Sequence, residues 1–128
     1  MLKNSLPEQF NDDELLLRAV LPYPRFWNNG KLSSAALKDS RGLSVDRTYD
    51  RTLEDSIAYM LQHLTGSVVT FTLPNCRAVN AVVKYCPTNN IYHSEIHGSE
   101  NRITLSGSQA KELALCAVVR YDMSVTST

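Results

Sequence analysis

The stretch Thr52–Leu73 reads TLEDSIAYMLQHLTGSVVTFTL and predicts a helix followed at once by a strand. Its first half carries apolar residues at helical spacing: Leu53, Ile57, Met60, Leu61 and Leu64. Thr52 is a typical N-cap, and the acidic residues after it suit the positive end of the helix dipole. Gly66 ends the helix predicted near 52–64, and the β-branched and aromatic run at 67–73 predicts a central strand that ends at Pro74.

Other segments extend this pattern in both directions. The short apolar run that begins at Leu15 and ends at Pro22 predicts a buried strand. Further strands are expected in GLSVDR (42–47), NAVVKY (80–85), IYHSEIH (91–97) and RITL (102–105). A second helix is expected near 107–118, capped by Ser106 or Ser108.

Strands and helices do not alternate regularly in this order, which argues against a doubly wound parallel sheet. We expect an α+β fold, with a mixed or mainly antiparallel sheet of five or six strands and two main helices packed against it. Residues 14–123 should form a single globular domain. A flexible lead-in is expected at 1–13, where Pro7 interrupts a polar segment, and a flexible tail at 124–128.

The overall charge balance argues against general nucleic-acid binding. The 128 residues carry 13 basic and 13 acidic side chains, so no long-range positive field attracts a phosphate backbone. Residues 25–51 are an exception, with six basic side chains against three acidic ones and a local charge of +3. A site for a small anion is therefore expected in that region.

The three cysteines indicate the compartment. Cys76, Cys86 and Cys116 show no C-x-x-C spacing, which suits neither a disulfide framework nor a zinc knuckle, so we expect reduced thiols. The N-terminal residues lack the apolar core of a secretion signal, and no apolar run is long enough to span a membrane. A soluble, cytoplasmic protein is expected.

The segment PYPRFWNNGKLSSAALKDSRG (22–42) is rich in prolines, turn residues and small side chains, and predicts an ordered loop. Phe26 and Trp27 are expected to anchor this loop to the core, the alternative being a platform for a ligand. Together with a histidine outside the loop, the segment 23–51 supplies the candidate binding residues: Trp27, Lys38, Arg41, Arg47 and His93.

Three titratable side chains are spaced two residues apart in HSEIH, and on a strand His93, Glu95 and His97 would share one face. Three interpretations remain open. The preferred one is the polar outer face of a strand, ahead of a carboxylate-centred ligand or catalytic site and a metal site. The metalloprotease motif is H-E-x-x-H on a helix, which this pattern does not match, and we expect no bound metal.

Arg18 interrupts an apolar strand and must reach an anion, a carbonyl or water, because a guanidinium stays charged in proteins. A structural ion pair with a strand carboxylate is the ordinary explanation. Glu95 is the first partner to test.

The stretches LLLRAV, FWNNGKLSSAALKD, GLSVDR and HSEIHG resemble a group of small uncharacterised bacterial proteins, over most of residues 14–118. The most specific part is GKLSSAALKDSRGLSVDR, although the pattern of that group has phenylalanine at the position of Leu37. This resemblance implies a compact bacterial domain and no particular activity.

A more distant similarity concerns ADP-ribosyltransferase-like domains, which present an arginine, a serine and a glutamate on successive strands around NAD. Arg18, one of Ser33, Ser34 and Ser44, and Glu95 occur here in that order. The similarity implies that Arg18 holds a phosphate or ribose edge and that the serine, most simply Ser44, orients the nicotinamide-side ribose. Glu95 would stabilise the positive charge that develops as the glycosidic bond breaks. The usual tyrosine and second-glutamate signatures are not clearly present.

Two functions follow from these observations. The preferred one is a binding or protein-interaction module that uses the 23–51 region for an unidentified protein partner or a small anionic ligand, with no cofactor and no membrane. The alternative is an NAD-using enzyme in which Arg18, Ser44 and Glu95 are catalytic. An enzyme should bring Arg18 and Glu95 together in a pocket, whereas a module should expose an apolar or basic patch.

Overall fold

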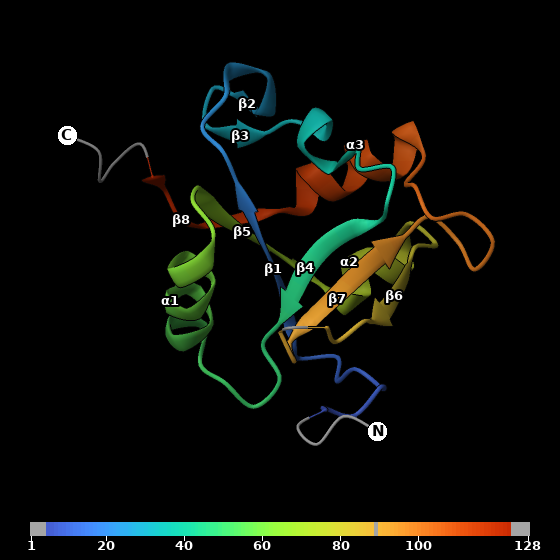
Figure 1. The fold of residues 1–128 in the computed structure, drawn as a ribbon. Helices are drawn as coiled ribbons and strands as arrows, with labels where there is room; N and C mark the ends of the chain where they lie inside the picture. Colours follow the sequence, from blue (N-terminus) through green and yellow to red (C-terminus); the bar gives the residue numbers. More distant parts are fainter. Residues whose placement is uncertain (1–4, 89, 124–128) are drawn as a thin grey trace.

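The computed structural model describes residues 5–88 and 90–123, which form a single α+β domain (Figure 1). Its main element is a six-stranded antiparallel sheet with the order β6-β7-β4-β1-β5-β8. These strands are β1 (Leu15–Val20), β4 (Leu43–Arg47), β5 (Ser67–Thr72), β6 (Val82–Tyr85), β7 (His93–His97) and β8 (Val118–Tyr121). The α+β class and the antiparallel sheet are as the sequence predicts. The tail expected at 124–128 lies outside the described residues.

Among the remaining elements described, only the helices α1 (Leu53–His63) and α3 (Gly107–Cys116) are long. Helix α2 (Leu73–Ala78) is shorter. The segment predicted to be an ordered loop contains the 3₁₀ turns η1 (Pro24–Phe26) and η2 (Ser34–Leu37) and a hairpin of β2 (Trp27–Asn28) and β3 (Lys31–Leu32). Thr52 caps α1 as predicted, since its side chain accepts a hydrogen bond from the amide of Asp55.

The two faces of the sheet are covered differently. On one face, Leu43, Val45 and Ile96 pack with Leu113 of α3 and with residues of α2 and η2. On the other face, Met60 of α1 packs only against the β1 and β5 half, where it meets Leu17 and Val68. Figure 1 shows α1 at the left, away from β4 and β7, whereas α2 lies behind β7 and α3 above β4. The half of this second face formed by β4, β7 and β6 is therefore not covered by α1.

Three local predictions differ from the structure. Pro74 does not end β5 in a turn but lies in the first turn of α2, where the missing amide hydrogen costs nothing, and Thr72 and Asn75 form a capping box. The second long helix ends at Cys116, and the valines after it pair with β5 as strand β8. Residues 102–105 form no strand in the described structure, because β7 already pairs with β4 on one side and β6 on the other.

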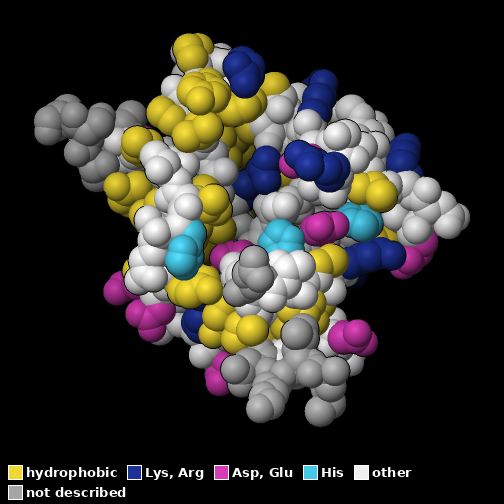
Figure 2. All heavy atoms as spheres, in the orientation of Figure 1, with side chains coloured by type: hydrophobic (Ala, Val, Ile, Leu, Met, Phe, Trp, Pro, Cys, Tyr) yellow, Lys and Arg dark blue, Asp and Glu magenta, His cyan; other side chains and the backbone are white. Residues whose placement is uncertain are grey.

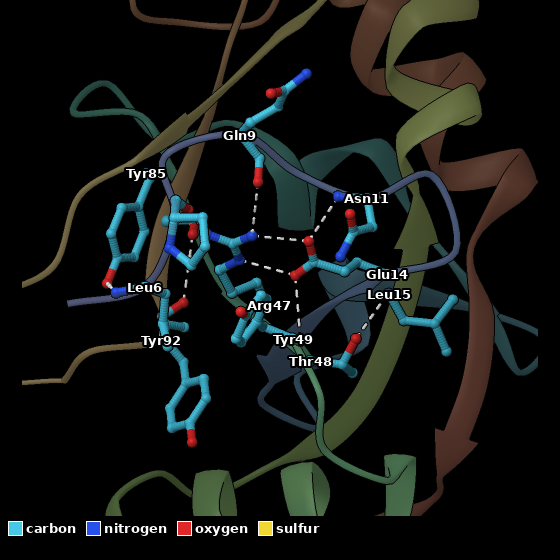
Figure 3. Close-up of polar contacts among 12 residues, drawn as sticks. Leu6, Gln9, Asn11, Glu14, Leu15, Arg47, Thr48, Tyr49, Tyr85 and Tyr92 are labelled. Atoms are coloured by element: carbon cyan, nitrogen blue, oxygen red, sulfur yellow. Dashed lines mark hydrogen bonds and ion pairs between the residues drawn. The ribbon is translucent and has the colours of Figure 1, made fainter. Parts of the chain in front are cut away.

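Residues 5–14 lie against the end of the sheet through one buried arginine (Figure 3). Arg47 is fully buried and forms a two-point interaction with Glu14, at 2.8 and 2.7 Å. Its Nη1 donates to the carbonyl of Pro7, and Nη2 donates also to the carbonyl of Gln9. The lead-in is thus attached to the domain along the described part of its length.

None of the helices in the described ranges has the length and hydropathy needed to cross a bilayer.

Candidate functional site

The uncovered half of the second sheet face, which we call the open face, carries polar side chains. Strand register places them opposite one another. Ser44 and Asp46 of β4 lie opposite Glu95 and His93 of β7, and Lys84 of β6 lies opposite Glu95 from the other side. Figure 2 looks onto this face, and shows histidines and acidic side chains interleaved across its middle. The period of two in β7 produces this arrangement, as the sequence predicts.

Glu95 lies between the two histidines of β7. His97 Nε2 is 2.7 Å from Glu95 Oε1, and His93 Nε2 is 3.7 Å from Glu95 Oε2. All three side chains are partly buried, with 24, 24 and 13% exposure for His93, Glu95 and His97. Within residues 5–88 and 90–123, no group of three histidine, cysteine or carboxylate side chains is arranged to hold a metal ion.

Gly42 leaves the space that this cluster occupies. A Cβ at Gly42 would lie 2.8 Å from Glu95 Oε1 and 3.1 Å from His97 Nε2. Gly42 also has a φ of +92°, which side chains rarely allow. The glycine in GLSVDR is therefore required both by the backbone and by the carboxylate beside it.

A groove of about 780 Å³ runs between α1 and the open face. Its apolar wall includes Leu21, Met60 and Leu64, and its floor is formed by β1 and β4. The polar side chains that line it are Arg18, Ser44, Asp46, Tyr59, His63, Thr65, Asn90 and His93. Apolar walls with a few convergent polar groups are typical of small-molecule sites.

Arg18 lies at the point where β1 and β4 separate. The two strands pair only at Leu16 and Leu17 of β1, and beyond them Arg18 Nη1 donates to the carbonyl of Ser44 at 3.0 Å. Its Nε is buried without a hydrogen-bond partner, and no carboxylate in the described part of the chain lies within ion-pair distance. Burial lowers the pKa of the guanidinium, which the charge of Asp39 partly opposes.

The expected pair of Arg18 and Glu95 is absent from the described ion pairs. Glu95 belongs to β7, and β4 lies between β7 and β1 in the sheet. Its carboxylate is directed to the histidines of its own strand. Arg18 reaches a carbonyl instead, which is one of the three partners that its charge permits.

Asp46 is the second charged residue of the groove. It is only 6% exposed, and its Oδ1 accepts a hydrogen bond of 2.9 Å from Asn90. Burial raises the pKa of the Asp46 carboxyl, although the Asn90 hydrogen bond and nearby cationic groups oppose this shift. A carboxyl group that is buried beside a groove is unusual at a purely structural position.

The remaining predicted site residues are distributed over the molecule. Arg47 is not at a binding surface, because it is fully buried and its donors are used within the protein. Trp27 packs against the core with Phe26 and donates to the carbonyl of Leu21 at 3.0 Å, which fits the anchoring role. Lys38 and Arg41 are exposed outside the groove. Of the five candidate binding residues, His93 lines it.

Of the three candidate serines, Ser44 is the one in contact with Arg18. Ser44 lines the groove, and its backbone carbonyl holds the guanidinium. Ser33 instead caps η2, with its side chain accepting from the amide of Ala35, and Ser34 begins that turn. Ser44 is therefore the serine that lies near both Arg18 and Glu95.

Sequence reasoning missed Asp46, Tyr59 and Asn90 as groove residues. Asp46 could have been identified from the sequence, because it alternates with Val45 in a predicted strand. A carboxylate on a strand near the sheet centre requires a partner. Tyr59 and Asn90 carry no such signal. They reach the groove only because α1 and the turn before β7 both line it in the folded chain.

Comparisons with protein-family models, with curated proteins and with solved structures gave no match.

Proposed function

We propose that the protein is a small-ligand binding domain whose groove between α1 and the open face takes an anionic molecule on Arg18. The observation that carries the proposal is that this guanidinium is incompletely paired within the described residues. It lines a groove, lacks a carboxylate partner in the described residues, and has one buried nitrogen without a hydrogen bond. Buried cations are normally paired, so a carboxylate or phosphate from outside would complete the site.

The second arginine of the sheet supports this interpretation by contrast. Arg47 is paired with Glu14 and bonded to backbone carbonyls, which is how this fold satisfies an arginine that has only a structural role. Arg18 has one such bond. The binding region expected at 23–51 thus contributes through Ser44, Val45 and Asp46 of β4, rather than through the loop before them.

The test is a panel of small carboxylates, inorganic phosphate and nucleotides, with binding measured by thermal shift and calorimetry. We expect at least one ligand class to bind, and Arg18→Met to weaken that binding at least tenfold. Lys111→Met removes an exposed charge from α3 on the opposite face and should leave binding unchanged. Binding that survives Arg18→Met, or no binding by any member of the panel, would overturn the proposal.

Lys38→Met distinguishes the groove from the loop. Lys38 is exposed and lies outside the groove, so its loss should have little effect on a ligand held by Arg18. If Lys38→Met weakens binding and Arg18→Met does not, the site is the basic loop. Arg18→Lys, which retains the charge, provides a second variant should the methionine variant fold poorly.

A second candidate function is NAD cleavage by Arg18, Ser44 and Glu95, as the similarity to ADP-ribosyltransferase-like domains implies. The observation that favours it is that Ser44 lies directly opposite Glu95 in the sheet while its carbonyl accepts from Arg18. Release of nicotinamide from NAD, followed by chromatography, tests it. Activity should disappear in Glu95→Gln and persist in Glu100→Gln, a more exposed acid paired with Lys84. No release above the buffer control would exclude this function.

A further inference from the structure

Two opposite charges line the groove without neutralising each other. Arg18 and Asp46 both contribute to its surface, and the ion pairs of the described residues do not include one between them. Arg51, His93 and His63 lower the pKa of Asp46 through their charge, whereas Asp39 raises that of Arg18. The groove therefore has a positive pole and a separate negative pole.

The strand geometry sets the scale of the groove at these poles. Arg18 Nη1 is held 3.0 Å from the carbonyl of Ser44, and Ser44 and Asp46 are alternate residues of β4. Alternate residues on one strand face are about 6.5–7 Å apart. A ligand with its two polar ends about one such step apart fits this scale.

Asp46 has acceptor capacity left for such a ligand. Asn90 donates to its Oδ1, whereas no described group donates to its Oδ2. Arg51, whose charge acts on Asp46, uses its Nε and Nη2 on the carbonyls of Thr48 and Arg47. A carboxylate oxygen gains most from a donor that is itself charged, such as an ammonium group.

Part of the groove wall is apolar and accessible. Leu21 and Leu64 line the groove and are 36% and 52% exposed, which is high for leucine, and Met60 lies beside them. Such a wall favours methylene groups over a polar linker, because their contact removes apolar surface from water.

Resting on the proposed function, we propose that the ligand is a small zwitterion, in which a carboxylate binds Arg18, an ammonium group binds Asp46, and a short aliphatic chain lies along the leucine wall. The ligand class is thus an ω-amino acid or a compound with the same three parts.

The probes are 5-aminopentanoate, which carries both charges, and pentanoate, which lacks the amine. Calorimetry with the full-length protein should show that 5-aminopentanoate binds at least tenfold more tightly than pentanoate. Asp46→Asn should remove this preference by weakening 5-aminopentanoate and leaving pentanoate nearly unchanged. Arg18→Met should weaken both ligands, and Lys111→Met neither.

The outcomes separate the two proposals. If pentanoate and 5-aminopentanoate bind equally and both depend on Arg18, the anion site stands and the zwitterion inference is wrong. If only phosphates bind, the anion site likewise stands and the zwitterion inference is likewise wrong. A preference for 5-aminopentanoate that survives Asp46→Asn also overturns the inference, since the amine is then recognised elsewhere. If no anion in the panel binds, the proposed function itself fails.

Discussion

Arg47 Nη2 lies 2.7 Å from Oε2 of Glu14, and the two side chains are 0% and 3% exposed. The pair joins the residue before β1 to the end of β4, and the rings of Phe10, Tyr49 and Tyr85 surround the guanidinium. Tyr49 also donates its backbone amide to Glu14 at 3.1 Å (Figure 3). Both charges are thus satisfied in a region from which water is excluded.

Glu14→Gln should strongly destabilise the protein. The change leaves Arg47 buried without its anion, and breaking a buried pair in this way typically costs about 3–5 kcal/mol. Asp12→Asn is the matched control, because the Asp12–Arg77 pair is exposed and such pairs contribute about 0–1 kcal/mol. Urea unfolding measures both free energies. Similar losses in the two variants would contradict a structural role for the buried pair.

Glu14 should also make the stability depend on acid pH. Burial alone would raise its pKa, but hydrogen bonds from Arg47 and from the amides of Asn11 and Tyr49 lower it below the ordinary 4.5. A carboxyl with a lowered folded pKa adds stability that is fully present above 4.5 and is lost as the pH falls through the folded value. Melting temperatures from pH 7 to pH 2 should therefore fall less steeply below 4.5 in Glu14→Gln than in the wild type. Parallel curves would argue against this coupling.

Gly42→Ala should destabilise the fold by more than about 1 kcal/mol, because the residue has a φ of +92° and the new methyl group would meet Glu95 Oε1. Gly107→Ala is the control. Nothing lies within 4 Å of a Cβ at Gly107, and this first residue of α3 tolerates alanine, with an expected gain of about 0.4–1 kcal/mol. Thermal unfolding compares the two. A neutral Gly42→Ala would mean that the Glu95 and His97 side chains move aside at little cost.

Much of the fold could be predicted because its signals are local. The cap at Thr52 and the alternation in β7 each lie within a few residues, whereas α1 ends at His63, three residues before the expected stop at Gly66. The strand expected at 102–105 was wrong for a reason that no local pattern contains. The neighbouring strand β7 had no free edge for it to pair with, since β6 returns to occupy the outer side of β7.

The candidate site was predicted in part. Arg18 stood out as a charge in an apolar strand, and the open face followed from the spacing of His93, Glu95 and His97. What the sequence could not provide is the order of the strands, which puts β4 between Arg18 and Glu95 and so prevents their pairing. Arg47 was predicted to lie at a binding surface, because it belongs to a segment rich in basic residues. The fold buries it completely instead.

The three cysteines should react with a thiol reagent at different rates. Cys116 is exposed, Cys86 is partly buried, and burial raises the pKa of Cys76 to about 12. The thiolate is the reactive form, so Cys76 should be labelled only when the protein unfolds. Labelling with a chromogenic disulfide, with Cys116→Ser to identify the fast site, measures this order. Rapid modification of Cys76 in the native protein would contradict its burial.

Asp46→Asn should stabilise the protein while it removes a ligand contact. Burial raises the pKa of Asp46 above 3.8, so the folded state holds its proton more tightly than the unfolded state does. The ionised group therefore reduces stability as the pH rises from 3.8 through the folded pKa, and the reduction is complete above that value.

The amide oxygen introduced by Asp46→Asn can still accept the hydrogen bond from Asn90, so the variant should lose little in packing. We expect a gain at pH 7 within the range of about 0.5–2 kcal/mol that is usual for stabilising substitutions, and a smaller difference below pH 3.8. Urea unfolding at both pH values measures it. A loss of stability at pH 7 would show that the charge of Asp46 supports the fold, and that a structural role, rather than a ligand, explains why a carboxylate lies beside the groove.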